Sequence, residues 1–185
     1  MSLILRLLLF ILASTFFLII SQRALKNPRS HGFFRFFIFE GILIIFLLNA
    51  PYWFHAPLSI RQIVSTALLF ASIYCVVQGV SLLKRKGGQR RRDSIPENLG
   101  FENTEHLVTE GIFAYIRHPM YTSLLLLAWG LFLKNITLIG LVVVITTTVF
   151  VVVAARVEEG ENIAFWGLRY RAYMRRTHRF IPFLY

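Results

Sequence analysis

One short polar segment combines residue types that could bind an anionic ligand. It runs from Arg117 through His118, Pro119 and Met120 to Tyr121, directly before an apolar run. Pro119 lacks an amide hydrogen and suits the first turn of a helix, so a helix is predicted to begin there, with His118 at its cap. The helix N-terminus then offers donors and a positive dipole end to an anionic group. Alternatively, these side chains only anchor the chain at a membrane surface.

A second polar segment follows the last apolar run and begins with three carboxylates, Glu158, Glu159 and Glu161. Carboxylates at a membrane boundary are costly unless they are paired or functional. On a helix, Glu158 and Asn162 stack at positions i and i+4, whereas Glu159 lies ~100° further round. We therefore expect one carboxylate of the adjacent pair to face a ligand and the other to face an arginine or solvent.

The elements that position these segments are apolar. Of the 185 residues, 56% are hydrophobic and 16% charged, against about 25% charged in typical soluble domains. The pattern predicts an all-α integral membrane protein with about five transmembrane helices in a single membrane domain. The expected spans cover residues 3–20, 33–54, 63–83, 120–133 and 136–155.

The predicted organisation has four parts along the chain. Residues 1–83 form three spans, and residues 84–118 form a cytosolic loop that ends in the histidine-proline motif. Residues 119–155 form a helical hairpin, because only Lys134 and Asn135 separate its two apolar runs. Residues 156–185 form a C-terminal interfacial helix and tail. The two polar parts are expected to enclose any ligand site.

The charge balance predicts the orientation. The chain has 20 Lys and Arg against nine Asp and Glu, a net charge of +11. With Met1 outside, all basic residues except Arg6, Arg61 and Lys134 lie on the cytosolic side, as the positive-inside rule requires. Contact with anionic membrane lipid is a secondary consequence. Nucleic-acid binding is excluded, because no aromatic-basic platform accompanies the charge.

Several smaller features are interpreted as structural. Cys75 is the only cysteine, which excludes an intrachain disulfide and a Cys-rich metal site, and the five histidines lack metal-ligand spacing. No metal is therefore expected. His31 lies next to a loop and is expected to be solvated. Glu40, inside the second span, is expected to pair with Arg35 or to face a substrate cavity.

The two motifs, in this order and separated by a hairpin, resemble those of a known family. Residues 107–111 run into the Arg-His-Pro-x-Tyr motif, and the glutamate pair follows the hairpin. The matching C-terminal residues are Trp166, Gly167, Tyr170, Tyr173, Arg179 and Pro182. The pattern resembles the membrane-embedded isoprenylcysteine carboxyl methyltransferases and the related phospholipid N-methyltransferases, over roughly residues 84–185.

The resemblance implies a methyltransferase that uses S-adenosylmethionine. Its acceptor would be lipid-soluble or prenylated, and the reaction would take place at the membrane–cytosol interface. The implied catalytic residues are Glu158, Arg156 and His118. The implied cofactor-binding residues are Glu105, His106, Leu107, Val108, Phe113, Arg117, His118, Pro119, Met120, Tyr121, Glu158 and Glu159. Glu158 is preferred to Glu159 for holding the cofactor.

The chain departs from the family pattern at several positions, and two of these bear on the site. Phe113 stands where the family usually has Tyr. Ala154 stands where the prenylcysteine enzymes have an arginine for the substrate carboxylate. Arg156 lies only two residues before Glu158, ~200° round the helix, and need not point into the same pocket. The absence of the family's arginine weighs against carboxyl methylation of a prenylated protein, and Phe113 implies the loss of a hydroxyl contact to the cofactor.

Other functions stay open at this point. A phospholipid N-methyltransferase is one alternative, a membrane reductase with a nicotinamide cofactor is another, and a non-enzymatic membrane adaptor is a third. A bacterial or archaeal cytoplasmic membrane, or the endoplasmic reticulum of a eukaryote, is the expected location. We expect the cofactor to enter from the cytosol, and the acceptor to enter from lipid near Tyr121, Leu124 and Leu125.

Overall fold

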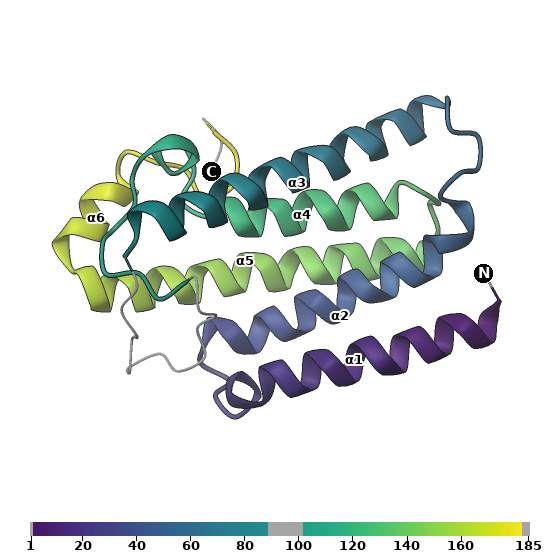
Figure 1. Cartoon of the computed structure of the whole chain (residues 1–185), viewed down its shortest axis with the longest axis horizontal. Coiled ribbons are helices and arrows are strands. Elements are labelled where there is room, and N and C mark those ends of the chain that lie inside the picture. The colour runs from purple at the N-terminus through teal and green to yellow at the C-terminus, as the bar shows by residue number, and fades with distance from the viewer. Residues whose placement is uncertain (1, 89–101, 183–185) are drawn as a thin grey trace.

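The computed structural model describes residues 2–88 and 102–182, and helices are its regular elements (Figure 1). The all-α prediction is confirmed for these residues. The predicted loop 84–118 is described only outside residues 89–101. The helices are α1 (Leu3–Leu25), α2 (His31–Asn49), α3 (Ile60–Lys86), α4 (Pro119–Phe132), α5 (Leu138–Trp166) and α6 (Leu168–Met174), with 3₁₀ turns η1 (Ala50–Tyr52) and η3 (Gly111–Ala114).

Four of these helices, α1, α2, α3 and α5, are long and apolar enough to cross a membrane. The fourth expected span is shorter than the others, because α4 has 14 residues. At 1.5 Å per residue it is about 21 Å long, less than the ~30 Å hydrocarbon core of a bilayer. The prediction of five spans thus becomes four long helices and one short apolar helix.

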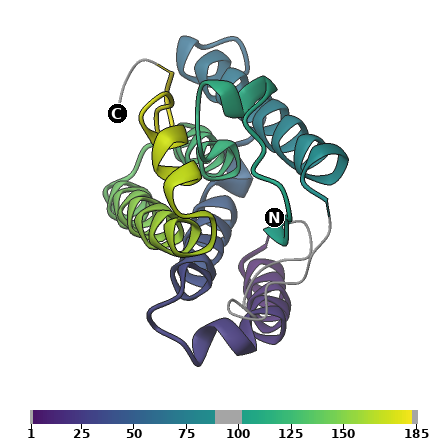
Figure 2. The same ribbon diagram turned by 90° about the vertical axis from the view of Figure 1, so that its left-hand side faces the viewer.

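The long helices lie side by side in an elongated bundle (Figures 1 and 2). Helix α2 packs along α5, α3 packs along α4, and α1 packs against α2. Gly41 permits the close approach of α2 to α5, since a Cβ there would lie 2.1 Å from the Thr147 hydroxyl oxygen. None of the residues in the most apolar stretch of α1 is buried by the rest of the protein. Such exposure is expected for an apolar helix that faces lipid.

The last turn of α4 is capped by side chains from α2 and α3. A helix end leaves its final carbonyls without partners, and a membrane offers no water to replace them. The amide of Asn49 donates to the Leu131 carbonyl at 2.8 Å, and the hydroxyl of Ser65 donates to the Gly130 carbonyl at 2.7 Å. Arg61 donates to the Leu133 carbonyl at 2.7 Å. These donors allow the short helix to end here, and they fix its position along the bundle axis.

The C-terminal part of the chain differs from the prediction of a separate helix from residue 156. Helix α5 continues without a break to Trp166, because the residues after Ala155 are compatible with a helix until Gly167, whose φ of 60° ends it. After α6, the tail returns to the start of α4. The amide of Arg117 donates to the His178 carbonyl at 2.8 Å, and the amide of His178 donates to the Tyr115 carbonyl at 3.0 Å.

The expected pairing of Glu40 with Arg35 does not occur. Glu40 accepts a hydrogen bond from the Ser14 hydroxyl of α1 at 2.7 Å. Position 40 lies five steps along the helix from position 35, which places their side chains ~140° apart around the axis. Glu40 therefore ties α1 to α2, and Arg35 is directed elsewhere.

Candidate active site

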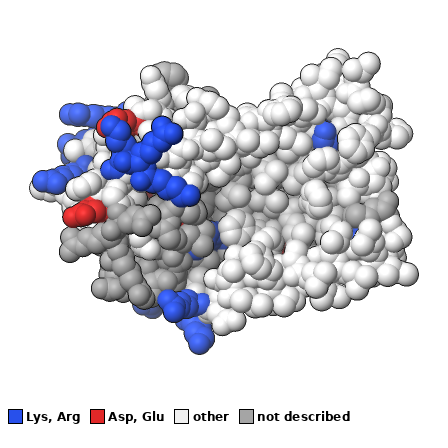
Figure 3. All heavy atoms as spheres, viewed as in Figure 1, with Lys and Arg blue, Asp and Glu red and all other residues white. Residues whose placement is uncertain are grey.

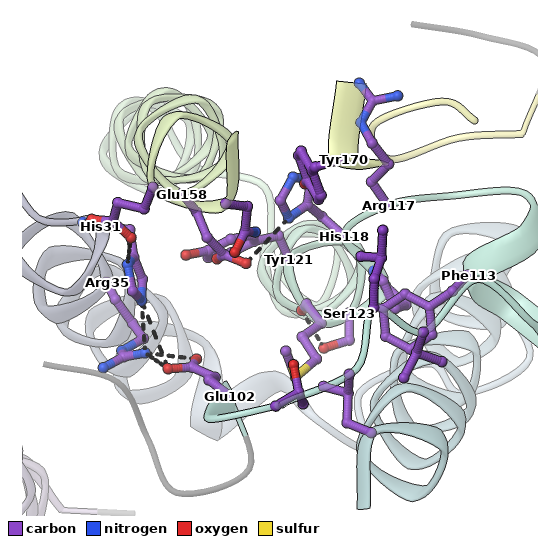
Figure 4. A pocket seen from close by; sticks show the side chains of 18 of the residues that line it. His31, Arg35, Glu102, Phe113, Arg117, His118, Tyr121, Ser123, Glu158 and Tyr170 are labelled. Atoms are coloured by element: carbon purple, nitrogen blue, oxygen red, sulfur yellow. Dashed lines mark hydrogen bonds and ion pairs between the residues drawn. The ribbon is translucent and has the colours of Figure 1, made fainter. Parts of the chain in front are cut away.

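A cavity of ≈ 310 Å³ lies at the motif end of the bundle, the end where Arg117, His118 and Pro119 begin α4 (Figure 4). Helices α2, α3, α4, α5 and α6 all contribute to its wall, together with residues between Glu102 and His118. Two clusters of polar side chains face each other across it, one around His118 and Glu158 and the other around Arg35 and Glu102, and most of the remaining wall is apolar. The cavity can therefore hold a ligand with both polar and apolar parts.

Most of the residues expected from the motifs meet in this wall. They come from the segment before α4, from the first turn of α4 and from α5. They are Leu107, Val108, Phe113, Arg117, His118, Pro119, Met120, Tyr121 and Glu158. Pro119 is the first residue of α4 and His118 is its cap, as the sequence predicted.

Four of the expected site residues lie outside the wall: Glu105, His106, Arg156 and Glu159. The amides of Glu105 and His106 both donate to the Gly87 carbonyl at 2.8 Å, and their side chains are exposed. Arg156 is also exposed, because it lies ~200° round α5 from Glu158. Glu159 is adjacent to the cavity but has different partners.

Glu159 is a buried carboxylate surrounded by cations. Its side chain is 5% exposed. The Arg117 Nε donates to its Oε1 at 2.8 Å, and the Arg179 Nη2 donates to its Oε2 at 2.7 Å. The His118 Nε2 lies 3.4 Å from the same Oε1. The charge of Glu159 is thus neutralised within the protein, and it holds the motif, α5 and the tail together.

Glu158 faces the cavity instead. Its side chain is 21% exposed, and within the described residues its one ion-pair contact is with the His118 Nδ1 at 3.8 Å. The two adjacent carboxylates therefore differ in environment, as their spacing on a helix requires. Glu158 is the carboxylate of this wall that is least compensated by the protein.

Two buried polar atoms beside Glu158 also lack hydrogen bonds. The Tyr121 hydroxyl forms none with residues that the structure describes, and the His118 Nε2 has only the 3.4 Å approach to Glu159, which is not a hydrogen bond. Both side chains line the cavity, and Tyr121 is 5% exposed. Buried polar groups are nearly always satisfied. This part of the wall is therefore suited to a ligand that both donates and accepts hydrogen bonds.

Aromatic side chains from α5 and α6 close the same end of the cavity. Trp166 stacks on Tyr170 with ring centroids 5.9 Å apart and planes inclined by 15°. The Tyr173 hydroxyl donates to the Phe113 carbonyl at 2.7 Å and so ties α6 to η3. Burial raises the pKa of both Tyr170 and Tyr173 above its ordinary value. Both hydroxyls therefore stay protonated at neutral pH.

The polar cluster on the opposite side of the cavity, around Arg35 and Glu102, was not expected from the sequence. The His31 Nδ1 lies 2.5 Å from the Glu161 Oε2, and the Arg35 Nη1 donates to both carboxylate oxygens of Glu102 at 2.7 Å. Burial alone would raise the pKa of the Glu102 carboxyl, but the charge of Arg35 and a hydrogen bond from His31 lower it to about 2. Glu102 is therefore ionised at neutral pH.

The expectation that His31 is solvated is wrong, since it is 2% exposed. The Ser30 hydroxyl accepts from the Phe33 amide at 3.3 Å and caps α2, so His31 is the first residue of the helix and packs against α5. One signal in the sequence pointed to this group. His31 and Arg35 lie at positions i and i+4 at the start of an apolar helix, where two cations on one face need anionic partners.

The environments of the two adjacent carboxylates predict different effects on stability. Glu159→Gln leaves Arg117 and Arg179 without their buried counter-charge, so it should lower the free energy of unfolding by ~3–5 kcal/mol. Glu158→Gln should change it by less than ~1 kcal/mol, because Glu158 has no close arginine partner among the described residues. Denaturant unfolding of the detergent-solubilised variants measures both. Equal losses would show that Glu159 has no special structural role.

Comparison with known proteins agrees with this geometry. The phospholipid methyltransferase family model matches residues 60–164. A methanethiol S-methyltransferase of Crocosphaera subtropica is 32% identical over 90 residues, covering 46% of this chain and 34% of the relative. A methanethiol S-methyltransferase of Pseudomonas deceptionensis is 27% identical over 73 residues, covering 40% of this chain and 27% of the relative.

The matched part thus spans about a third or less of the length of these relatives. No solved structure matches the chain significantly. The family match extends over more than half of the chain and contains both the Arg117–Tyr121 motif and the carboxylate pair Glu158 and Glu159. The chain therefore belongs to the phospholipid methyltransferase family.

Proposed function

We propose that the protein transfers a methyl group from S-adenosylmethionine to a lipid-soluble acceptor at the membrane–cytosol boundary. The observation that carries the proposal is one cavity that joins under-compensated polar groups, Glu158, His118 and Tyr121, to an apolar wall. Membership of the phospholipid methyltransferase family supports methyl transfer as the chemistry. The names of the two relatives support the same chemistry, with a sulfur acceptor in their case.

The residues of the wall fit S-adenosylmethionine. The cofactor carries a cationic sulfonium, an ammonium, a carboxylate and ribose hydroxyls. Glu158 would accept from its hydroxyls or balance its positive charge. The Tyr121 hydroxyl and the His118 Nε2, which form no hydrogen bond with the described residues, would gain polar partners from the cofactor. The stacked pair Trp166 and Tyr170 offers a flat apolar surface to its adenine ring. Bound there, the cofactor would supply an activated methyl group.

The tasks of the chain in this reaction are positioning and exclusion of water. Methyl transfer is an in-line displacement, which depends on alignment of acceptor and donor. Pro119 and the capped end of α4 hold His118 and Tyr121 in place, and the ion pairs of Glu159 hold α5 against them. The apolar residues Phe113 and Met120 limit access of water to the cavity.

The expectation that no metal is needed stays a prediction. Within residues 2–88 and 102–182, no group of three or more His, Cys, Asp and Glu side chains is placed to hold a metal ion. In-line methyl displacement does not need one, so the proposed reaction is described by protein side chains and cofactor alone.

The acceptor enters the proposal as a lipid-soluble molecule that reaches the cavity from the membrane. Phe39 of α2 and Val76 and Leu83 of α3 form its wall on a side where these two helices make no extensive contact with each other. Of the residues expected to guide the acceptor, Tyr121 and Leu124 line the cavity, whereas Leu125 packs against the core. Phospholipid N-methylation is the second candidate, and the description of the matched family favours it.

Three ligands distinguish the candidate functions in calorimetry of the purified protein in detergent. Micromolar binding of S-adenosylmethionine or S-adenosylhomocysteine supports the methyltransferase. Binding of a nicotinamide cofactor instead would support a reductase, and binding of neither would support a non-enzymatic adaptor. Incubation of membranes with methyl-labelled cofactor, followed by separation of lipid, protein and small molecules, then identifies the class of acceptor.

Glu158→Gln should weaken the binding of S-adenosylhomocysteine more than tenfold, because loss of a charged acceptor in a desolvated pocket costs ~1.5–3 kcal/mol. Glu110→Gln is the matched control, since Glu110 is exposed and lies 3.5 Å from the exposed Lys86. Calorimetry measures both affinities, and unfolding measurements confirm that both variants are folded. If the two variants bind alike, Glu158 does not hold the cofactor.

The motif end of the bundle is proposed to face the cytosol. Lysine and arginine side chains gather at this end, while the remaining surface in view is mostly uncharged (Figure 3). The exposed basic residues there include Arg23, Lys26 and Arg29 before α2 and Lys84, Arg85 and Lys86 at the end of α3. This asymmetry favours a cytosolic location by the positive-inside rule.

Reporter fusions test this orientation. Alkaline phosphatase, which is active only outside the cytosol, should give a signal when inserted at Pro57, between α2 and α3, and none when fused after Tyr185. Green fluorescent protein, which is fluorescent only in the cytosol, should give the opposite pattern. The same signal from both positions would contradict the proposed topology.

A further inference from the structure

Arg35 is a buried cation in the cavity wall that the proposed cofactor site does not use. It is 7% exposed, and its Nη1 donates to both carboxylate oxygens of Glu102 at 2.7 Å. Figure 4 shows Arg35 and Glu102 together on one side of the cavity, across from His118 and Tyr121. The guanidinium thus holds an anion, and that anion belongs to the chain itself.

The position of Arg35 along the bundle places it level with the proposed methyl-transfer site. On one side of it, His31 of α2 contacts Glu161 of α5, and on the other, Ile38 of α2 and Ala154 of α5 belong to the same buried apolar cluster. Because α2 and α5 pack along each other between these two contacts, Arg35 lies opposite the turn that carries Glu158. An anion on Arg35 would therefore lie in the same cross-section as Glu158.

Glu102 is attached to the chain differently from the other buried carboxylate, Glu159. Glu159 belongs to the long helix α5, whereas Glu102 lies outside the long helices, in the segment that precedes η3. Its side chain is 13% exposed, against 5% for Glu159. Glu102 can move away from Arg35 without unwinding a long helix.

The surroundings of Arg35 define the shape of a ligand that could replace Glu102. Phe39 follows Arg35 by four residues on α2, and Val76 and Leu124 add apolar surface to the same cavity. Glu161 is already occupied, since it accepts from the His31 amide at 3.1 Å and contacts its imidazole. A matching ligand has one anionic group for Arg35 and an apolar chain that extends toward lipid.

Repulsion between carboxylates favours a ligand that replaces Glu102 over one that joins it. The cavity wall carries three carboxylates, Glu102, Glu158 and Glu161. An additional anion would meet all three at low dielectric, where like charges repel strongly. A buried guanidinium, in turn, is costly without a counter-charge. Exchange of one oxyanion for another satisfies both conditions.

We propose that Arg35 is the anion-binding residue of the acceptor site and that Glu102 occupies it until an anionic amphiphile takes its place. The ligand presents a carboxylate or phosphate oxygen to Arg35, and its apolar part lies along Phe39. The inference rests on the proposed function for the identity of this site as the acceptor site. The exchange at Arg35 itself does not depend on methyl transfer.

The two partners of this ion pair should respond in opposite directions when each is neutralised. Glu102→Gln removes the internal competitor but keeps a side chain of the same size, so anionic amphiphiles should bind about tenfold more tightly. Arg35→Gln removes the binding cation, so they should bind at least tenfold more weakly. Glu110→Gln, on the exposed surface, should leave the affinity unchanged. A purely structural ion pair would give a loss of stability in both variants and a gain of affinity in neither.

The probes are radiolabelled laurate and dodecyl phosphate, with dodecanol as the uncharged control. Equilibrium binding is measured on protein in phosphatidylcholine nanodiscs, after subtraction of binding to empty nanodiscs. Binding of laurate alone identifies a carboxylate ligand, and binding of dodecyl phosphate alone identifies a phosphate ligand. Either result supports the proposal if Glu102→Gln strengthens and Arg35→Gln weakens it, while dodecanol binds all variants equally.

The proposal is overturned if neither anion binds the wild-type protein or Glu102→Gln, or if the two variants change affinity in the same direction. If Glu102→Gln does not fold, Glu102→Asp draws the carboxylate back by one methylene and should give a smaller gain of affinity. S-adenosylhomocysteine binding is measured on the same samples. If it is absent while the opposite responses remain, the anion site stands and the proposed function falls. If it is present without them, only the anion site falls.

Discussion

A carboxylate with almost no access to solvent, Glu159, forms the ionic centre on which the rest of the site depends. Its partners come from distant parts of the chain: the cations Arg117 before α4 and Arg179 in the tail, and the imidazole of His118. A buried carboxylate is stable only when such partners are present and correctly placed. The start of α4, the middle of α5 and the tail must therefore meet at one point. Because Glu159 is held by Arg117 and Arg179, the adjacent Glu158 on the same helix faces the cavity.

A second constraint fixes α4 along the bundle axis. The helix is too short to reach from one side of a bilayer to the other, and its last carbonyls are met by Asn49, Arg61 and Ser65. Its first turn is held by the tail, where the Thr122 hydroxyl donates to the Phe180 carbonyl at 2.9 Å. With both ends fixed, His118 and Tyr121 keep a defined height relative to Glu158. The cavity is thus rigid on the side proposed for the cofactor, and its one exchangeable contact is proposed on the opposite side, at Arg35.

The sequence predicted those features that depend on local spacing. The apolar runs predicted the helices, Pro119 predicted the start of α4, and the ~100° step between adjacent helical residues predicted different partners for Glu158 and Glu159. The end of α5 was predicted poorly, since charged residues after Ala155 suggested a boundary that the backbone does not need. Gly167 was the better signal for it, because a positive φ favours glycine.

The i and i+4 spacing of His31 and Arg35 indicated that these two residues need anionic partners, but it could not identify the partners, because the contacts join residues that lie far apart in the chain. His31 and Glu161 are separated by 130 positions, and Arg35 and Glu102 by 67. No periodicity relates them, and each alone resembles an ordinary boundary residue. The packing of α2 along α5 brings His31 to Glu161, and the segment before η3 brings Glu102 to Arg35.

The central claim is that the cavity beside His118 and Glu158 binds S-adenosylmethionine. Hydrogen exchange of the detergent-solubilised protein, measured by mass spectrometry with and without S-adenosylhomocysteine, tests it most directly. The account predicts slower exchange in peptides that cover residues 104–121 and 158–180, with no change in α1, which takes no part in the cavity. Unchanged exchange in both of these regions, or protection confined to α1 or to the turn between α4 and α5, would contradict it.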